Sequence, residues 1–312
     1  NRAASERCRL PRSWCALMKG RLIALDHIGD REAAALMVDG KLDDLIVAQA
    51  AGPVPGSIYR AEVGRQMKGQ GGVIVSLGEG QKGFLRGVKN ASPGDRLMVQ
   101  ITGHAEAGKA TPVTPKLLFK SRYAIVTPDA PGINISRAIR DDDIRDALLL
   151  TAHETMSDSG FGLIVRSSAA KAEAEAIAED IEAMRALADA VLAKAEGPPA
   201  LVHLGDGPHL IAWREWTDPA QVDTDAGCFE THDILDLFEH IAREYGGLAG
   251  GFTMFIDPTR ARVAVDVNTG GDTSPAAGLK SNIAAANALP TQLRLRGLGG
   301  QITMDLATMT KR

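Results

Sequence analysis

The stretch ARVAVDVNTGGD, residues Ala261–Asp272, alternates apolar and polar residues like a strand with one buried face. Its valines share one face, so Asp266 and Asn268 share the other. The segment QITMDL, residues Gln301–Leu306, alternates in the same way and sets Asp305 opposite its apolar residues. Two predicted strands therefore present one aspartate each.

These two aspartates suggest a cation site. Carboxylates among so many aliphatic side chains are costly to bury unless a cation or several donors compensate them. Mg²⁺ typically takes one or two carboxylates and completes its octahedron with water and substrate phosphate oxygens. We therefore predict a Mg²⁺ site on Asp266 and Asp305, with Asn268 orienting a phosphate or a water. The spacing leaves a second interpretation open, in which both aspartates only cap loops at strand ends.

The residues between the two strands predict a helix over 279–295, rich in alanine and ending at Gly297. Arg294 and Arg296 lie in its last turn, where a cation interacts favourably with the helix dipole and can also meet phosphate. The helix would connect the two aspartate-bearing strands.

The segments DVNTGGD, which starts at Asp266, and PTQLRLRGLGGQITMD, which ends at Asp305, closely resemble the catalytic segment of the bacterial ribonuclease E/G family. The resemblance implies that Asp266 and Asp305 bind the catalytic Mg²⁺ and that Asn268 helps to place the scissile phosphate. It implies a short, ribonuclease G-like endoribonuclease that acts on single-stranded RNA in RNA processing and decay, including rRNA processing. Such an enzyme favours 5′-monophosphorylated substrates and leaves 5′-phosphate and 3′-hydroxyl ends.

Length and charge set the limits of this interpretation. A chain of 312 residues predicts two or more domains. Its net charge of −4 is unfavourable for a nucleic-acid-binding protein, so any basic surface must be local. Aromatic residues make up only 4% of the chain, so base stacking would depend on very few side chains.

The cysteines indicate a reducing, cytoplasmic setting, because Cys8, Cys15 and Cys228 form neither a disulfide framework nor a CxxC pair. The apolar runs fall short of the ~20 residues that a membrane-spanning helix needs. The resemblance implies a homodimer. The cysteine pair through which longer family members share zinc has no equivalent here, so a zinc-linked tetramer is not expected.

The first 17 residues are rich in arginine and show no apolar period. We interpret them as an extension, expected to be disordered and excluded from the fold. They are either translated upstream of a natural start at Met18 or an arginine-rich transit peptide.

The resemblance implies an α+β multidomain fold. It consists of a ribonuclease-H-like scaffold over 18–54 and 199–245, an OB-fold barrel over 55–119, a 5′-sensor domain over 120–198 and a deoxyribonuclease-I-like catalytic subdomain over 246–312. Family members continue past Arg312, so this subdomain is expected to be truncated. The residues themselves predict a small barrel from the short strands and glycine turns after Gly56. Residues 201–216, LVHLGDGPHLIAWREW, predict a hairpin that completes the scaffold.

The barrel carries the first predicted RNA contacts. Phe84 and Lys109 fall where the family has an RNA-contacting phenylalanine and lysine, which supply a stacking surface and a phosphate partner. Ile74 occupies a second position where an aromatic residue is usual, and this predicts weaker stacking. The alternative is that Phe84 is an ordinary residue of the barrel core.

A second set of contacts is predicted where a strand over 160–168 leads into a helix. There Arg166, Ser167 and free helix N–H groups can converge on one anion. This resembles the family's 5′-sensor pocket, which binds the terminal monophosphate of the RNA, and Ile125 and Arg137 align with positions in or near it. The alternative is that Ser167 caps the helix and Arg166 forms a surface ion pair.

Two other functions stay open. The acidic balance and Ile74 are also compatible with an RNA-binding regulatory relative that cleaves weakly or not at all. A metal-dependent nuclease acting on DNA is the other. The seven histidines are scattered and form no pair at catalytic spacing, which argues against cleavage through the RNA 2′-hydroxyl.

Overall fold

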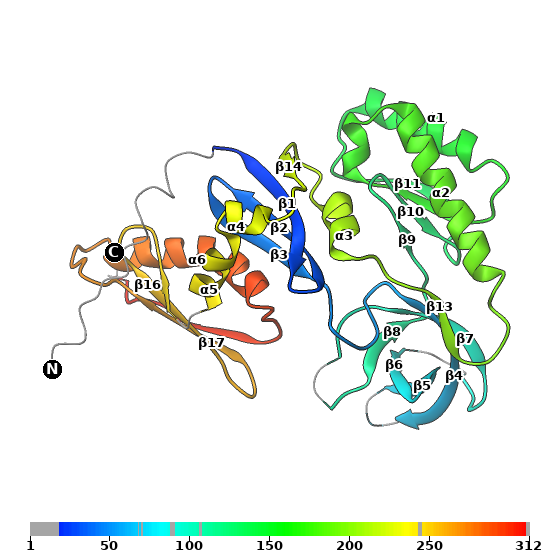
Figure 1. The fold of residues 1–312 in the computed structure, drawn as a ribbon, viewed down its shortest axis with the longest axis horizontal. Coiled ribbons are helices and arrows are strands. Elements are labelled where there is room, and N and C mark those ends of the chain that lie inside the picture. Colours follow the sequence, from blue (N-terminus) through cyan, green and yellow to red (C-terminus); the bar gives the residue numbers. More distant parts are fainter. Residues whose placement is uncertain are drawn as a thin grey trace. The chain divides into compact units, whose positions relative to one another are not determined.

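The computed structural model describes residues 19–67, 69, 71–87, 91–105, 108–242 and 245–309, so the predicted extension lies outside the described residues. The fold is mixed α and β (Figure 1). It divides into two compact units, one made of Asn1–Ala48 with Asp218–Arg312 and the other of Gln49–Thr217. The chain thus leaves the first unit, builds the second, and returns.

The first unit begins with an antiparallel meander that glycine turns connect. Its strands are β1 (Arg21–Ile28), β2 (Arg31–Val38) and β3 (Lys41–Val47), and β14 (Gln221–Asp223) pairs with β1 in parallel. Two short helices, α4 (Cys228–Thr231) and α5 (Ile234–Ala242), contribute to its core. Asp26 joins sheet and helix, since its Oδ2 accepts hydrogen bonds from the backbone N–H groups of Gly227 and Phe229 at 3.0 and 3.2 Å.

A second sheet of the first unit carries the aspartates. Its order is β15 (Tyr245–Gly247), β16 (Thr253–Pro258), β17 (Val263–Asn268) and β18 (Ile302–Asp305). The helix α6 (Ala277–Leu295) makes the crossover between the parallel strands β17 and β18 and packs on one face of the sheet (Figure 1). The predicted helix is therefore confirmed, and it begins two residues earlier than expected.

The second unit contains the predicted barrel. Five strands form a closed ring in the order β4 (Ile58–Met67), β5 (Gly72–Gly78), β6 (Gln81–Arg86), β8 (Thr111–Thr114) and β7 (Arg96–Ile101), because β4 also pairs with β7. Alternate residues such as Val75, Leu85 and Val99 fill the interior with 0% exposure. A sixth strand, β13 (Ala200–His203), adds to β4 from outside the ring.

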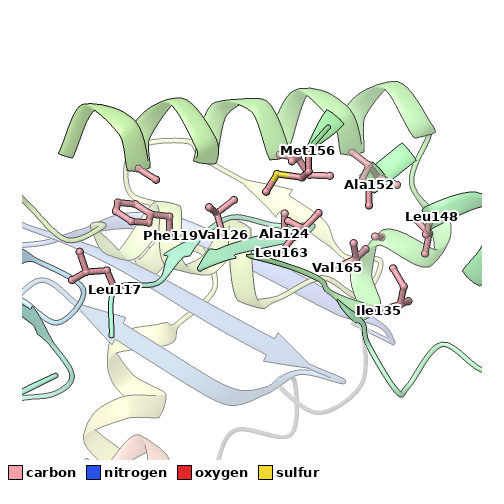
Figure 2. Packing of buried hydrophobic residues seen from close by; sticks show 14 of the residues in the cluster. Leu117, Phe119, Ala124, Val126, Ile135, Leu148, Ala152, Met156, Leu163 and Val165 are labelled. Carbon is pink, nitrogen blue, oxygen red and sulfur yellow. The ribbon is translucent and has the colours of Figure 1, made fainter. Parts of the chain in front are cut away.

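A third layer in the same unit combines a four-stranded sheet with two helices. Its strands are β9 (Phe119–Lys120), β10 (Ala124–Thr127), β11 (Gly132–Ile135) and β12 (Gly162–Val165), and its helices are α1 (Asp142–Thr155) and α2 (Ala174–Leu192). Figure 2 shows Val165 of β12 near Leu148 and Ala152 of α1, and Val126 of β10 belongs to the same buried cluster. The sheet is covered by helices on this face. Its opposite face carries Ile125 and Ile164, which pair across β10 and β12.

The prediction of a hairpin over residues 201–216 is wrong. After β13 the chain forms the helix α3 (Pro208–Glu215), and β13 itself pairs with the barrel. Pro208 occupies the first turn of this helix, where its fixed φ and missing N–H are no disadvantage. The turn signal of Gly205–Pro208 therefore marks a helix start rather than the tip of a hairpin.

Within the part of the chain that the structure describes, none of the helices is both long enough and apolar enough to cross a membrane.

Candidate functional site

The two aspartates lie side by side on neighbouring strands. In the parallel pair β17 and β18, Asp266 is in register with Asp305. Neighbouring strands run about 4.8 Å apart, and residues in register on a pleated sheet point to the same face. The valines of β17 are at most 4% exposed under α6, so both carboxylates belong to the opposite, open face.

Both aspartates are more exposed than the sequence predicted. Asp266 and Asp305 were expected to be desolvated by aliphatic neighbours, but both are exposed. Met304 packs on the core as predicted, whereas Ile302 and Leu306 are 38% and 48% exposed. The case for a cation therefore rests on two adjacent like charges on an open face, not on burial.

Asn268 lies close to the pair. Its side-chain amide Nδ2 donates a hydrogen bond to Asp266 Oδ2 at 2.6 Å, which orients that carboxylate. The loop after Asn268 then turns sharply at Gly270, with φ +58°. A Cβ at Gly270 would lie 2.6 Å from the carbonyl oxygen of Gly251, so only glycine fits there without a shift. The end of β17 is thus held against the loop that precedes β16.

The chain after β18 is held by a buried amide on α6. Asn282 is 8% exposed; its Nδ2 donates to Ala307 O at 2.9 Å and its Oδ1 accepts from Ala307 N at 3.0 Å. The side-chain amide of Asn282 therefore satisfies both backbone groups of Ala307, as a neighbouring strand would. Since Ala307 is two residues beyond Asp305, this contact positions the second aspartate of the pair. The role of Asn282 was not predicted from the sequence, where an asparagine among helical alanines was the available signal.

The donors at this face fit Mg²⁺. The described ranges contain no group of three or more histidine, cysteine, aspartate or glutamate side chains arranged for a metal. Two carboxylates in register nevertheless match the one or two that Mg²⁺ takes when water and substrate phosphate oxygens complete its shell. Asp266 and Asp305 are the residues that would hold such an ion.

Arg294, one of the two predicted phosphate contacts in the last turn of α6, has a different partner. Its guanidinium forms ion pairs with Asp43 and Asp44 of β3, at 3.1 and 3.5 Å. It therefore ties α6 to the first sheet of its unit.

On the barrel, the three predicted RNA contacts meet in one groove. Ile74, Phe84 and Lys109 all line a cavity of about 740 Å³. Ile74 on β5 pairs with Phe84 on β6, and Phe84 pairs with Pro112 on β8, so these three form a row across the barrel wall. Along β5 and β6, the residues of this row alternate with residues that are buried inside the barrel. Phe84 itself is only partly buried. Phe84 is therefore not a residue of the barrel core.

The groove also contains residues that the sequence analysis did not single out, namely Met67, Arg86, Thr102 and His104. Arg86 lies over the ring of Phe84, with its guanidinium carbon 5.5 Å from the ring centroid. A stacked guanidinium adds both a planar surface and a positive charge. The pairing arises from alternation along β6, where Phe84 and Arg86 share a face.

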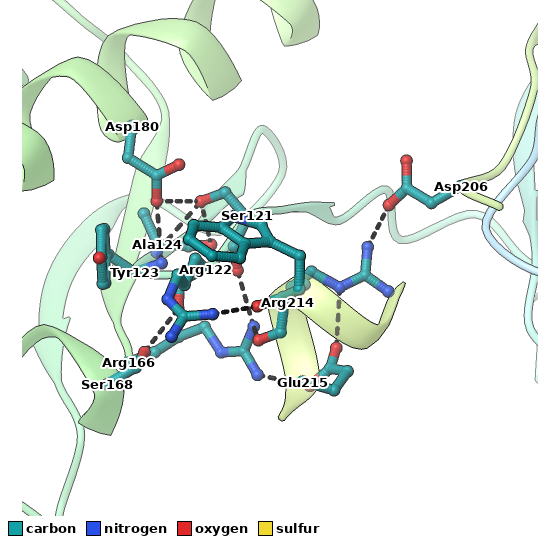
Figure 3. A network of polar contacts seen from close by, with 11 residues as sticks. Ser121, Arg122, Tyr123, Ala124, Arg166, Ser168, Asp180, Asp206, Arg214 and Glu215 are labelled. Atoms are coloured by element: carbon teal, nitrogen blue, oxygen red, sulfur yellow. Dashed lines mark hydrogen bonds and ion pairs between the residues drawn. The ribbon is translucent and has the colours of Figure 1, made fainter. Parts of the chain in front are cut away.

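The predicted anion site at Arg166 is filled by the protein's own groups (Figure 3). Nη2 of Arg166 contacts Glu215 Oε2 at 2.5 Å, and its Nη1 donates to the carbonyl of Ser121 at 2.7 Å. The other oxygen of Glu215 accepts from Nε of Arg214 at 2.8 Å. Burial raises the pKa of Glu215, but the hydrogen bonds and charges of Arg214 and Arg166 together lower it by more than burial raises it. The pKa of Glu215 therefore lies below its ordinary value. Arg166 thus forms the ion pair that the alternative interpretation foresaw.

The other predicted members of the anion site lie around Arg166. Ser167 is exposed and begins a 3₁₀ helix, η2 (Ser167–Lys171), so the long helix α2 starts later than expected. Ile125 is partly buried on β10. Arg137 is exposed just after β11, whose neighbour Ser136 donates its N–H to Val165 O at 2.9 Å. The structure therefore brings these residues to one end of the same sheet.

The helix α3 supplies groups to this site that the hairpin prediction concealed. They are Trp213, Arg214 and Glu215. Trp213 is 59% exposed, and the guanidinium carbon of Arg122 lies 4.1 Å from its ring centroid. Figure 3 shows how α3 brings Arg214 and Glu215 to Arg166, while Arg214 also forms an ion pair with Asp206. A proline in a first helical turn was the signal that could have placed them.

Sequence comparison shows which known proteins this chain is similar to. The model of the Ribonuclease E/G family matches residues 119–225 and 214–312, which together make up more than half of the chain. A Ribonuclease E of Nostoc sp. is 25% identical over 347 residues, covering 93% of this chain and 50% of the relative. A Ribonuclease G of Salmonella typhimurium is 23% identical over 352 residues, covering 91% of this chain and 71% of the relative.

A third relative, the Ribonuclease E of Escherichia coli, is 28% identical over 260 residues, covering 70% of this chain and 24% of the relative. The chain spans about half the length of the Nostoc and Synechocystis relatives that it matches. The similarity to the Nostoc protein covers both compact units.

Proposed function

The chain belongs to the ribonuclease E/G family, and on that premise we propose that it is a Mg²⁺-dependent endoribonuclease that cleaves single-stranded RNA. The register of Asp266 with Asp305 on an open sheet face is the observation that carries this proposal. The two carboxylates are exposed on parallel strands and form a compact acidic site, and the amide of Asn268 is hydrogen-bonded to one of them, Asp266.

In this proposal the protein's own groups hold and orient the reactants. Asp266 and Asp305 hold the cation, and Asn268 keeps Asp266 in one orientation or turns its amide to the scissile phosphate. Mg²⁺, when bound, supplies charge to polarise the phosphate and to make a water a better nucleophile. Attack of water in line on phosphorus breaks the bond to the 3′-oxygen, which leaves as a 3′-hydroxyl and so produces a 5′-phosphate on the other fragment.

RNA would reach the acid pair through contacts elsewhere in the chain. The groove of Ile74, Phe84 and Lys109 offers a stacking ring and a cation, the two features with which small barrels bind single strands. Arg166 and Ser167, with Ile125 and Arg137, would bind a 5′-terminal monophosphate once Glu215 is displaced. The sheet that carries them fits the family's 5′-sensor domain, and the barrel fits its OB-fold domain.

The remaining assignments complete the proposal. The meander β1–β3 with β14 fits the ribonuclease-H-like scaffold, and the sheet β15–β18 with α6 fits the deoxyribonuclease-I-like catalytic subdomain. The active form would be a homodimer that acts in RNA processing and decay in the cytoplasm. These assignments are supported by the family match and the order of the elements.

One experiment separates the proposed activity from its rivals. Labelled single-stranded RNA and DNA of the same sequence are incubated with the protein in Mg²⁺ or in EDTA. The proposal expects cleavage of RNA in Mg²⁺ alone, with 5′-phosphate ends on the downstream fragments. Equal cleavage of DNA would identify a general nuclease, and RNA binding without cleavage at any Mg²⁺ concentration would identify a regulatory RNA-binding relative.

A further inference from the structure

The helix α3 carries two tryptophans with different surroundings. Trp216, at its C-terminal end, is 8% exposed, and together with Pro208 and Ala212 it forms the buried side of the helix. Residues four apart lie on one face of a helix, so Trp213 lies outside this buried side. It is 59% exposed. Folding therefore leaves apolar area of Trp213 in water, which a flat partner can cover.

Arg122 holds the indole of Trp213 from one side. Its guanidinium carbon lies 4.1 Å from the ring centroid, and its Nη1 donates a hydrogen bond to the carbonyl oxygen of Trp213. A guanidinium on the face of a tryptophan is an attractive contact. One face of the ring is therefore engaged by Arg122, while more than half of the side chain stays in solvent. A ring held in this way loses little freedom when a flat partner stacks on its other face.

The same arginine adjoins the predicted anion site. Arg122 follows Ser121, whose carbonyl accepts a hydrogen bond from Nη1 of Arg166 at 2.7 Å (Figure 3). Glu215, whose carboxylate forms the ion pair with Arg166, comes two residues after Trp213 on α3. Both the strand side and the helix side of the anion site are therefore connected to the exposed indole.

We propose that Trp213 is a stacking surface for a nucleobase at the 5′ end of the RNA, beside the phosphate that Arg166 would bind; the inference rests on the proposed 5′-monophosphate site. Stacking on an aromatic ring is open to every base, because each base has a π face. The two contacts complement one another, since the phosphate brings charge and the base brings apolar area. Trp213 thus favours an RNA with a single-stranded 5′ end, because a base inside a duplex must first be unpaired and unstacked.

The test compares substitutions that keep or remove the ring. Trp213→Phe keeps an aromatic face, and Trp213→Leu keeps apolar volume without one. Leu210→Ala is the matched control, because Leu210 is 60% exposed one turn earlier on the same helix. Circular dichroism and thermal unfolding establish that each variant is folded.

The readout is RNA binding in EDTA, which separates it from Mg²⁺-dependent cleavage. A single 2-aminopurine is placed at successive positions of a 5′-monophosphorylated oligouridine, and its fluorescence is measured with each variant. Wild-type protein should quench the probe at one of the first two positions. Trp213→Leu should lose this quenching, and Trp213→Phe should retain it in part. Kd for the same RNA should rise roughly 5-fold or more in Trp213→Leu and stay unchanged in Leu210→Ala.

The proposal is overturned by quenching that persists in Trp213→Leu, by quenching at interior positions alone, or by an equal loss of affinity in Leu210→Ala. Equal quenching with a 5′-hydroxyl RNA also overturns it, because no phosphate then anchors the base. A changed elution of Trp213→Leu in size-exclusion chromatography, with RNA binding intact, would identify a contact between protein chains instead. If the quenching is seen and lost as expected but no RNA is cleaved in Mg²⁺, the stacking role holds and the nuclease role fails.

Discussion

The carboxylate of Glu215 forms an ion pair with the guanidinium of Arg166, with Oε2 of Glu215 2.5 Å from Nη2 of Arg166. Its other oxygen, Oε1, accepts a hydrogen bond from Arg214. A carboxylate has the charge and planar oxygens that a phosphate would present to the same arginine. At the predicted anion site, Glu215 therefore takes the place that a phosphate would take on Arg166. Any 5′-phosphate must displace Glu215 before it can bind there.

Replacing Glu215 by glutamine should strengthen recognition of a 5′-phosphate. Loss of the competing charge frees Arg166 while the amide still fills the space. We expect the ratio of cleavage rates for 5′-monophosphate and 5′-hydroxyl RNA to rise roughly 3- to 10-fold. Asp206→Asn is the matched control, because Asp206 pairs with Arg214 and not with Arg166. A rise in both variants, or in neither, contradicts this role of Glu215.

The same contact predicts an acid sensitivity. Because the pKa of Glu215 is lowered in the folded protein, its ion pairs stabilise the fold above the ordinary glutamate pKa. That stability is lost as the pH falls through the lowered folded-state pKa. Unfolding midpoints measured between about pH 3 and 6 should therefore depend less on pH in Glu215→Gln than in the wild-type protein. Parallel curves would show that the carboxylate is not coupled to folding.

Adding a second aromatic ring to the barrel groove should tighten RNA binding. Ile74 is in register with Phe84 and lines the same groove, so Ile74→Phe would give a base two rings to contact. Affinity for a single-stranded oligonucleotide should increase about 5-fold or more, and Phe84→Ala should reduce it by a similar factor. Leu150→Phe adds a ring at an exposed position of α1 outside the groove and should change nothing.

Removal of the Asn282 amide should reduce catalysis more than binding. Asn282→Leu leaves the N–H and C=O of Ala307 without the partners they have on α6 and loosens the chain next to Asp305. We expect a lower kcat with an unchanged Kd for RNA and a lower Tm. Asn287→Leu changes an exposed asparagine on the same helix and should keep wild-type kcat. An equal kcat in both variants would show that this contact does not position Asp305.

Cys228 should resist alkylation in the folded protein. Burial raises the pKa of its thiol to about 11, and the nearby charges of Asp26 and Asp223 add to this. Relative to the ordinary value of 9.0, the thiolate fraction near neutral pH falls by about two orders of magnitude. In a variant with Cys8 and Cys15 replaced by serine, iodoacetamide at pH 8 should label Cys228 only after unfolding. Rapid labelling of the native protein would contradict the buried, neutral thiol.

The sequence predicted what local periodicity controls. Alternation along 263–268 placed the valines on one face of the strand and Asp266 on the other, and glycine-punctuated strands predicted the barrel. It could not predict the contact of Arg166 with Glu215, since the two are 49 positions apart and depend on α3. That helix was missed because a Gly-Asp-Gly-Pro turn has the same local signature in a hairpin and at a helix start.

The register of the acid pair was equally beyond local rules. A long crossover connects Asp266 and Asp305. A shift of one residue in the register of β18 would turn the side chain of Asp305 toward the core. The contacts of Asn282 with Ala307 and the packing of Met304 select the observed register. These are tertiary contacts between residues far apart in the sequence, so a local sequence pattern cannot predict them.

The most direct test of the acid pair is single-turnover RNA cleavage in Mg²⁺ by Asp266→Asn, Asp305→Asn and the double variant, with RNA binding measured alongside. If the two carboxylates act together on one ion, each single change should lower the rate roughly 10³-fold or more, the double variant should be little worse, and Kd for RNA should change little. Mg²⁺-dependent cleavage that survives in the double variant at a rate near that of the wild-type protein would contradict this account.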